Sequence, residues 1–278
     1  MGRPILLAIA ISVAVVYPAH SQIQSGTILV FTYTQGVFVI AADSRQIHTG
    51  TKPTPPPSDT YCKIVALGGR VIFASTGATS LKNEVGLPNW SSTDEAAKAT
   101  RLIPMSVNGA NVNAVADSWS QAIAGNWRLM QQRLPEEVSR EAAMEDGSLT
   151  VGIFASVENG RITVAMRRVI FDAASHSIIT RTSVECPLGA WCAAGKTAVF
   201  HEFLNRTSPR ARADSETWDT HPPRTIGDAL PFAIHLVDLT IAYDPDGDVG
   251  GQIDALALKS DGSIYWRQRK PNCAEKED

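Results

Sequence analysis

Apolar residues run almost without interruption through two short segments near the start of the chain, residues 27–31 and 37–41. Both segments are rich in β-branched and aromatic residues, and the polar Thr34-Gln35-Gly36 lies between them. Such runs predict two β-strands joined by a turn. Because the runs are nearly continuous rather than alternating, we expect the strands to lie in a sheet that is covered on at least one face.

Polar, proline-rich sequence separates these strands from the next pair. Residues 46–61 contain a cluster of prolines, and proline cannot donate to a strand ladder, so the pattern predicts an exposed loop without a central strand. Two further apolar runs, residues 63–67 and 71–74, flank Gly68-Gly69 and predict a hairpin.

The periodicity then changes from that of strands to that of helices. An Ala-rich segment begins at Thr93, and apolar residues recur at helical spacing over Val112–Leu134, where Pro135 is expected to end the helix. Residues 148–182 return to a strand pattern, with Asn159-Gly160 as a turn.

The last third of the chain predicts two more helices and a final hairpin. The helices cover residues 196–205 and 225–243, and strands over 252–258 and 263–266 pair across Asp261-Gly262. The order of strands, helices, strands, helices and strands contains no repeat and no linker long enough to divide it. One α+β domain of layered type accounts for this order.

The first residues predict a secretory signal peptide. Arg3 supplies a positive charge, Pro4–Val16 is apolar and uncharged, and small residues stand at Ala19 and Ser21. This layout predicts cleavage after Ser21, so that residues 1–21 are removed and the product is secreted or periplasmic. The alternative is a buried first helix or strand. The run is too short for a stable transmembrane span and no second one reaches that length, so we expect no membrane span after cleavage.

Composition narrows the class of protein and indicates its redox environment. With 25 Lys and Arg against 28 Asp and Glu, the net charge of −3 lacks the basic excess of a nucleic-acid-binding protein. An apolar content of 44% excludes global disorder. In an oxidising compartment, Cys186 and Cys192 can close a small loop and leave Cys62 and Cys273 as the second pair, although four cysteines permit three connectivities.

Several segments together resemble the proteasome β-type subunits. Residues 26–31 and 36–45, which end in Ala41-Ala42-Asp43-Ser44-Arg45, are similar to the start of such a subunit. Lys63-Ile64-Val65 and Ser75-Thr76-Gly77-Ala78 resemble the family's lysine strand and glycine turn, and residues 246–251 resemble its late Asp-x-x-Ser-Gly-Gly segment. The similarity covers residues 26–81 and 244–266.

The resemblance implies an N-terminal nucleophile (Ntn) hydrolase, whose fold is a four-layer αββα sandwich of two antiparallel sheets flanked by helices. It implies that Thr27 is the nucleophile, with Asp43 and Lys63 as charged neighbours, Gly77 as the oxyanion-side amide and Asp246 as a further support. It also implies that the chain cuts its own Gly26–Thr27 bond. Residues 22–26 would then be a short propeptide and residues 27–278 a single catalytic domain.

The chemistry of these residues is coherent. A threonine hydroxyl is a weak nucleophile and needs a base. The free α-amino group of Thr27, with an ordinary pKa near 8, can act as that base. A nearby Lys63 cation lowers the amine's pKa, Asp43 holds the lysine, and a glycine amide at Gly77 stabilises the oxyanion. The set requires no histidine, metal or cofactor, and its substrate is a peptide or another amide.

Other functions remain open from the sequence. Val249 stands where the family has a serine, and a Cys186–Cys192 segment replaces a Ser-Gly-rich turn, so a catalytically silent assembly or binding subunit is the main alternative. Ring assembly is typical of the family, which makes a homo-oligomer a further expectation. A third alternative is a secreted, calcium-stabilised binding domain without enzyme activity, because the carboxylates of Asp244, Asp246 and Asp248 are spaced as at the start of a calcium loop, although the later ligands are missing.

Overall fold

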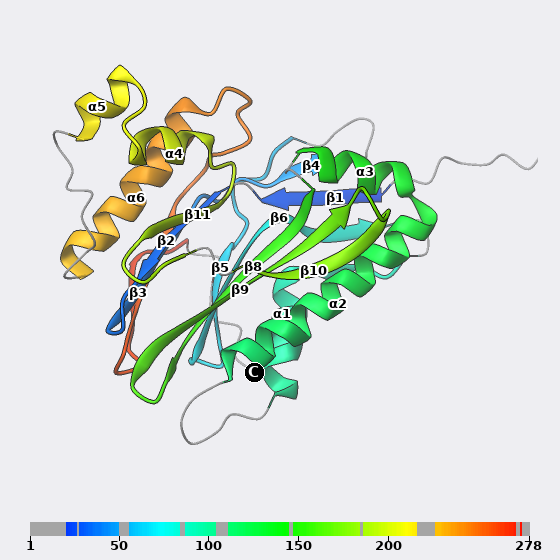
Figure 1. Cartoon of the computed structure of the whole chain (residues 1–278), viewed down its shortest axis with the longest axis horizontal. Helices are drawn as coiled ribbons and strands as arrows, with labels where there is room; N and C mark the ends of the chain where they lie inside the picture. The colour runs from blue at the N-terminus through cyan, green and yellow to red at the C-terminus, as the bar shows by residue number, and fades with distance from the viewer. Residues whose placement is uncertain are drawn as a thin grey trace, which may run out of the picture.

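Two antiparallel sheets lie face to face between two groups of helices in the computed structural model (Figure 1). The structure describes residues 21–26, 28–49, 56–83, 87–103, 111–144, 147–183, 186–215, 226–270 and 273. These residues form thirteen strands and six helices. The protein is therefore of the α+β class that the order of elements predicts.

Sheet A contains eight strands in the order β10-β9-β8-β6-β1-β4, with β5 and β7 also paired to β6. Its members are β1 (Ser21–Gly26), β4 (Ile47–Thr49), β5 (Ile64–Leu67), β6 (Val71–Asn83), β7 (Trp90–Ser91), β8 (Ser148–Glu158), β9 (Arg161–Asp172) and β10 (Ser177–Ser183).

Sheet B contains five strands in the order β11-β2-β3-β12-β13. They are β2 (Ile28–Tyr33), β3 (Val37–Ala42), β11 (Trp191–Gly195), β12 (Asp254–Lys259) and β13 (Ile264–Gln268). The two apolar runs near the start of the chain thus form the adjacent strands β2 and β3, as the sequence predicts, and the final hairpin is β12 and β13.

Three helices lie on the outer side of each sheet (Figure 1). The helices on sheet A are α1 (Ser92–Leu102), α2 (Val112–Arg133) and α3 (Pro135–Met144), and those on the sheet B side are α4 (Ala198–Leu204), α5 (Pro209–Ser215) and α6 (Ile226–Tyr243). Side chains fix two of the starts, because Ser91 accepts a hydrogen bond from Asp94 N and Asn111 accepts one from Ala114 N.

Three hydrophobic clusters separate the four layers. One joins α1, α2 and α3 to sheet A, a second joins α4, α5 and α6 to sheet B, and the third lies between the sheets. Residues of β3 alternate between clusters, since Val39 faces the helices and Ile40 faces the other sheet. Burial on both faces explains why β2 and β3 are continuously apolar.

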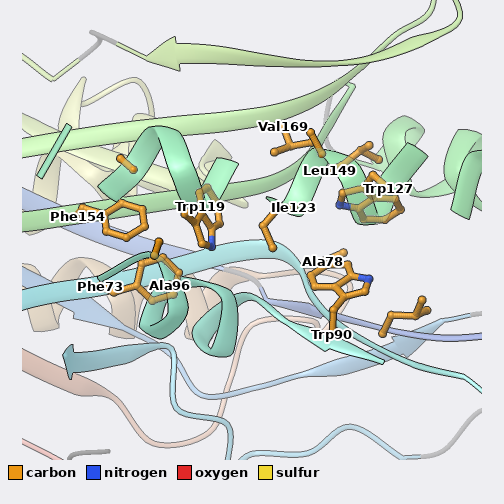
Figure 2. Close-up of a cluster of buried hydrophobic side chains, with 14 of the residues drawn as sticks. Phe73, Ala78, Trp90, Ala96, Trp119, Ile123, Trp127, Leu149, Phe154 and Val169 are labelled. Atoms are coloured by element: carbon orange, nitrogen blue, oxygen red, sulfur yellow. The ribbon is translucent and has the colours of Figure 1, made fainter. Parts of the chain in front are cut away.

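Aromatic side chains dominate the cluster under α2 (Figure 2). The ring of Trp119 lies 5.7 Å from that of Phe73 and 5.5 Å from that of Phe154. Gly152 of β8 leaves the space for it, because a Cβ atom there would lie 2.5 Å from the Trp119 ring. Close packing of this kind fixes α2 against β6 and β8.

Several predicted boundaries differ from the structure. The strand expected over 71–74 continues to Asn83 as β6, and a short edge strand, β4, lies inside the segment expected to be loop. Pro135 ends α2 but also begins α3, since proline is well tolerated at the first position of a helix. The sequence also does not predict β1, β11 or α5.

Both expected cysteine pairs are disulfides. Cys62 bonds Cys273 with the Cα atoms 5.5 Å apart, and Cys186 bonds Cys192 with the Cα atoms 5.7 Å apart. Two disulfides are consistent with an oxidising compartment. Among the helices that the structure describes, none has both the length and the apolar character needed to cross a membrane. The predicted signal peptide, residues 1–21, lies outside the described residues except for Ser21.

Candidate functional site

The chain passes from one sheet to the other at residue 27. β1 ends at Gly26 in sheet A, and β2 begins at Ile28 in sheet B. Thr27, the predicted nucleophile, lies outside the described residues, but its covalent neighbours on both sides are described. The contacts of these two neighbours therefore define the surroundings of the candidate site.

On the upstream side, β1 lies between two antiparallel partners. Gly26 is opposite Gly77 of β6, and Ser25 is opposite Ala78 of β6 and Ile47 of β4. In Figure 1, β1 runs beside β4 and β6, away from the helices that cover sheet B. The segment before residue 27 is thus an inner strand of sheet A, with a neighbouring strand on either side.

On the downstream side, a buried carboxylate holds the backbone of Ile28. Oδ1 of Asp43 accepts a hydrogen bond of 3.1 Å from Ile28 N and also pairs with the Lys63 ammonium group. Oδ2 of Asp43 accepts hydrogen bonds from the backbone N atoms of Arg45 (3.2 Å) and Gly250 (3.1 Å). The side chains of Asp43 and Lys63 are both fully buried, so water does not screen their attraction.

The strand ends explain how these two residues meet. Asp43 directly follows β3 and Lys63 directly precedes β5, so each side chain arises where a strand of one sheet approaches the other sheet. Burial lowers the pKa of the Lys63 ammonium group, because it penalises the charged form, and the charge of Asp43 opposes that effect. The structure therefore brings together two of the predicted site residues.

Gly77 has a conformation and a location that require glycine. Its φ angle is +74°, and a Cβ atom would lie 2.6 Å from the Leu149 carbonyl oxygen. The residue stays within β6, opposite Gly26 on one side and Thr150 on the other. The family-like glycine turn is therefore a distorted point inside a long strand, directly across from the residue that precedes Thr27.

The loop of residues 247–250, which precedes β12, also contacts the site. A Cβ atom on Gly250 would lie 2.5 Å from the Arg45 guanidinium carbon. The Arg45 guanidinium donates to both Asp59 carboxylate oxygens, at 2.8 and 3.0 Å, and to Gly247 O at 2.8 Å. Arg45 therefore fastens the 247–250 loop beside Asp43, and small residues in that loop make room for it.

Asp246 lies in the same loop, but its side chain points to a different partner. The side chain is 67% exposed and accepts a hydrogen bond of 2.8 Å from the Lys196 ammonium group. Lys196 also pairs with Asp248 at 2.5 Å and lies 3.6 Å from Asp244. The calcium-like carboxylates thus surround a lysine. None of the side-chain contacts described for Asp246 links it to Asp43 or Lys63.

Three charged residues near the site are missed by the sequence analysis. Lys196 follows Gly195, whose β11 position is opposite Ile28. Asp254 and Lys270 form a second buried ion pair, with Lys270 Nζ 2.6 Å from Asp254 Oδ2. The sequence predicts only that Lys196 begins a helix, that Asp254 lies within a strand and that Lys270 follows the final strand, and none of these positions indicates a site. In the described part of the chain, no cluster of His, Cys, Asp or Glu is arranged to hold a metal ion.

A cavity of about 580 Å³ opens at the β11–α4 connection. Its wall includes Gly195 and Lys196 of the β11–α4 connection, together with Phe31 of β2 and Val151 of β8. Volumes of this size accommodate small-molecule ligands. Gly195 connects the cavity to the candidate site, because it is paired with Ile28 in sheet B.

No protein-family model matches the chain, and a comparison with curated proteins finds no similar sequence. The interpretation of the site therefore depends on its geometry and on the resemblance of its motifs.

Proposed function

We propose that this protein is an exported threonine-type Ntn hydrolase that cuts its own Gly26–Thr27 bond and then hydrolyses peptide bonds in other molecules. One observation carries the proposal. Both neighbours of Thr27 are anchored, Gly26 in register with Gly77 and Ile28 by the Asp43 carboxylate, which pairs with Lys63 in a fully buried position. Such anchoring of a would-be nucleophile and its target bond supports catalysis by orientation.

The self-cleavage step balances with water as the only co-reactant. The Thr27 hydroxyl oxygen attacks the Gly26 carbonyl carbon, and the C–N bond breaks while the hydroxyl proton passes to the nitrogen. Water then hydrolyses the resulting ester, leaving a carboxylate on Gly26 and a free amine on Thr27. Gly77, across the strand pair from Gly26, is the residue whose amide would stabilise the oxyanion.

After cleavage, the new amine takes over as the base. An α-amino group has an ordinary pKa of about 7.7–8.0, and a positive charge nearby lowers that pKa, so more of the amine is neutral and able to accept the hydroxyl proton. Lys63 is a buried cation bound to the same Asp43 oxygen that accepts from Ile28 N, which supports this role, and Asp43 both neutralises it and holds the chain at Ile28. This division of roles follows the implied family mechanism.

The location of β1 favours an extended peptide as the substrate. β1 is held on both sides by strands, and it ends in the residue whose carbonyl would be attacked. Departure of this segment leaves a slot between β6 and β4, where another extended peptide can form main-chain hydrogen bonds. Compared with a small acylated metabolite, a peptide makes fuller use of this slot.

The observed layers fit the αββα sandwich that the resemblance implies, with helices outside two packed antiparallel sheets. Within that arrangement, residues 22–26 would be the propeptide and residues 27–278 the catalytic domain. Secretion or export to a periplasm and a homo-oligomeric state remain predictions.

One observation favours the alternative, a catalytically silent assembly or binding subunit. Val249 occupies the position of a family serine, and its side chain is 2% exposed and packed in the cluster between sheet B and its helices. Val249 therefore supplies no hydroxyl to the site. The carboxylate of Asp246, the expected further support, pairs with Lys196. A silent subunit would keep the fold and the buried Asp43–Lys63 pair without cutting the chain.

The mass of the mature protein distinguishes the two functions. We expect the purified exported protein to begin at Thr27, the Thr27→Ala variant to retain residues 22–26, and Thr27→Ser to be processed. Ser25→Ala is the matched control, because it removes a neighbouring hydroxyl from β1 and leaves the nucleophile intact. A wild-type protein that begins at Gln22 would overturn the proposal.

Labelling then tests the activity of the new terminus. An electrophile that reacts with both the hydroxyl and the amine of an N-terminal threonine should label the wild-type protein once and leave Thr27→Ala unlabelled. Equal labelling of both proteins would exclude Thr27 as the nucleophile.

A further inference from the structure

A second buried ion pair lies at the same end of the same two strands as Asp43. Asp254, the first residue of β12, is opposite Ala42, the last residue of β3, and Asp43 follows Ala42 directly. The side chain of Asp254 is fully buried, and that of its partner Lys270 is 4% exposed. The ladder register therefore brings two carboxylates and two ammonium groups into one buried region, with no net charge.

The C-terminal segment that carries Lys270 is fastened to the residues just before Lys63. Lys270 Nζ donates a hydrogen bond of 2.5 Å to Tyr61 O, and Lys270 N donates one of 2.9 Å to Asp254 Oδ1. The disulfide between Cys62 and Cys273 attaches the next residue along. Cys273 N in turn donates to Lys270 O at 3.0 Å. Tyr61 and Cys62 are thus held by residues about 210 positions away.

We propose that Lys270, with Asp254, is a positioning residue for Lys63: the pair holds the backbone that presents Lys63 and lies beside the buried Asp43–Lys63 pair. This inference rests on the proposed function, because it assigns a task to Lys63 in an Ntn hydrolase. It adds a residue that the motif resemblance does not contain.

The electrostatics agree with the geometry. Burial is the main cause that lowers the pKa of Lys63; the positive charge of Lys270 lowers it further, and Asp43 and Asp254 oppose both effects. Burial lowers the pKa of Lys270 also, with Asp254 and Asp43 raising it. Two other charged groups of the described residues act on the pair: Asp59 interacts with Lys63, and Arg45 interacts with Asp43.

Removing the Lys270 charge should therefore strengthen proton binding by Lys63. In Lys270→Met, Lys63 loses the repulsion of one cation, while Asp254 loses its partner and attracts Lys63 without opposition. The titration midpoint of the Lys63 ammonium should shift to higher pH. Lys270→Arg retains the charge and should keep the midpoint close to that of the wild type.

The experiment reads Lys63 directly and does not depend on hydrolysis. The 13Cε resonance of Lys63 is titrated by NMR in full-length Thr27→Ala protein, with and without Lys270→Met, and is assigned from its loss in Lys63→Met. Labelling of the N-terminal threonine in the corresponding Thr27 proteins is followed by mass as a function of pH. We expect Lys270→Met to move both the Lys63 midpoint and the alkaline limb of the labelling profile to higher pH, and Lys270→Arg to keep both close to those of the wild type.

A second variant protects the test against misfolding. Asp254→Asn/Lys270→Met leaves no unpaired buried charge and should fold, with a Lys63 midpoint nearer to that of the wild type than the midpoint of Lys270→Met. If Lys270→Met does not fold, Asp254→Asn serves instead, and its Lys63 midpoint should fall because one carboxylate is lost. Midpoints that do not move in these folded variants would overturn the inference. A different outcome separates the two proposals: the Lys63 midpoint shifts in Lys270→Met, but the wild-type chain never cuts itself. That result would overturn the proposed hydrolase and leave the coupling between the two lysines standing.

Discussion

The buried Asp43–Lys63 pair allows a quantitative test of the site that needs no substrate. Both side chains are fully shielded from solvent, so a variant that removes one partner leaves an uncompensated charge inside the protein. Breaking a buried pair in this way typically costs about 3–5 kcal/mol of unfolding free energy. Lys63→Met should therefore remove a large part of a stability that, for a domain, is about 5–15 kcal/mol.

Asp43→Asn should cost more than Lys63→Met. The carboxylate accepts hydrogen bonds from the backbone N–H groups of Ile28, Arg45 and Gly250, as well as pairing with Lys63. In Lys63→Met these three donors still satisfy the carboxylate. In Asp43→Asn, the new amide nitrogen is itself a donor, so at least one buried backbone N–H loses its acceptor, at about 1–3 kcal/mol each.

The assay is urea unfolding of full-length chains that all carry Thr27→Ala, so that self-cleavage does not change the molecule between variants. A double-mutant cycle with Asp43→Asn/Lys63→Met isolates the interaction of the pair. The exposed Lys98–Glu95 pair, whose lysine side chain is 57% exposed, is the matched control and should couple by less than about 1 kcal/mol.

Two results would refute this reasoning. A coupling energy for Asp43 and Lys63 as small as that of the control pair would mean that the carboxylate and the ammonium group do not depend on each other. Equal destabilisation by Asp43→Asn and Lys63→Met would mean that the three backbone donors contribute nothing through Asp43.

Two further predictions concern glycine geometry and pH. Gly77→Ala should lower the melting temperature and prevent self-cleavage because its Cβ atom meets Leu149 O, whereas Gly69→Ala, also at positive φ but in open space, should cost only backbone strain; equal melting temperatures would contradict this. Hydrogen bonds from Arg210 and Ser208 lower the pKa of Glu202 from 4.5 to about 2. The stabilisation is therefore fully present above pH 4.5 and lost as the pH falls through about 2. The wild-type protein should melt at a higher temperature than Glu202→Gln near pH 4.5, and the two melting temperatures should converge near pH 2.

Local patterns in the sequence predict much of the fold. The apolar runs that become β2 and β3 and the hairpin turn at Gly68-Gly69 depend on neighbouring residues alone, and the structure contains them. The periodic segment of α2 is equally local, and its predicted end agrees within one residue with the observed end at Arg133.

The elements that the sequence does not predict are made by distant partners. Residues 75–83 are mostly small and polar, yet they continue β6 because β8 pairs with its residues up to Gly77, β1 pairs with it from Gly77 onward, and β7 pairs with Ser80 and Leu81. β1 itself is short and polar, and only its pairing with β6 and β4 makes it a strand. No local propensity carries that information.

The same limit applies to the site. The meeting of Asp43 and Lys63 could be expected, because the motif resemblance supplies both residues. The role of Lys270 could not be expected, since this residue follows the final strand. Its hydrogen bond to Tyr61 O and the nearby Cys62–Cys273 disulfide both join segments about 210 residues apart in the sequence. The pairing of Lys196 with three aspartates likewise requires β11, a strand of small residues that carries only a weak strand signal.

In the proposed hydrolase, the embedding of β1 has a consequence for the timing of activity. A cut after Gly26 removes the covalent link but leaves the severed segment held by two strand neighbours and by Ile23, whose side chain is 1% exposed in the cluster beneath α1 and α2. Burial of such a side chain is worth about 1.5–3 kcal/mol. The liberated pentapeptide would act as a resident competitor, so the proposed hydrolase should show a lag before turnover whose length is set by first-order release of the peptide and is not shortened by dilution.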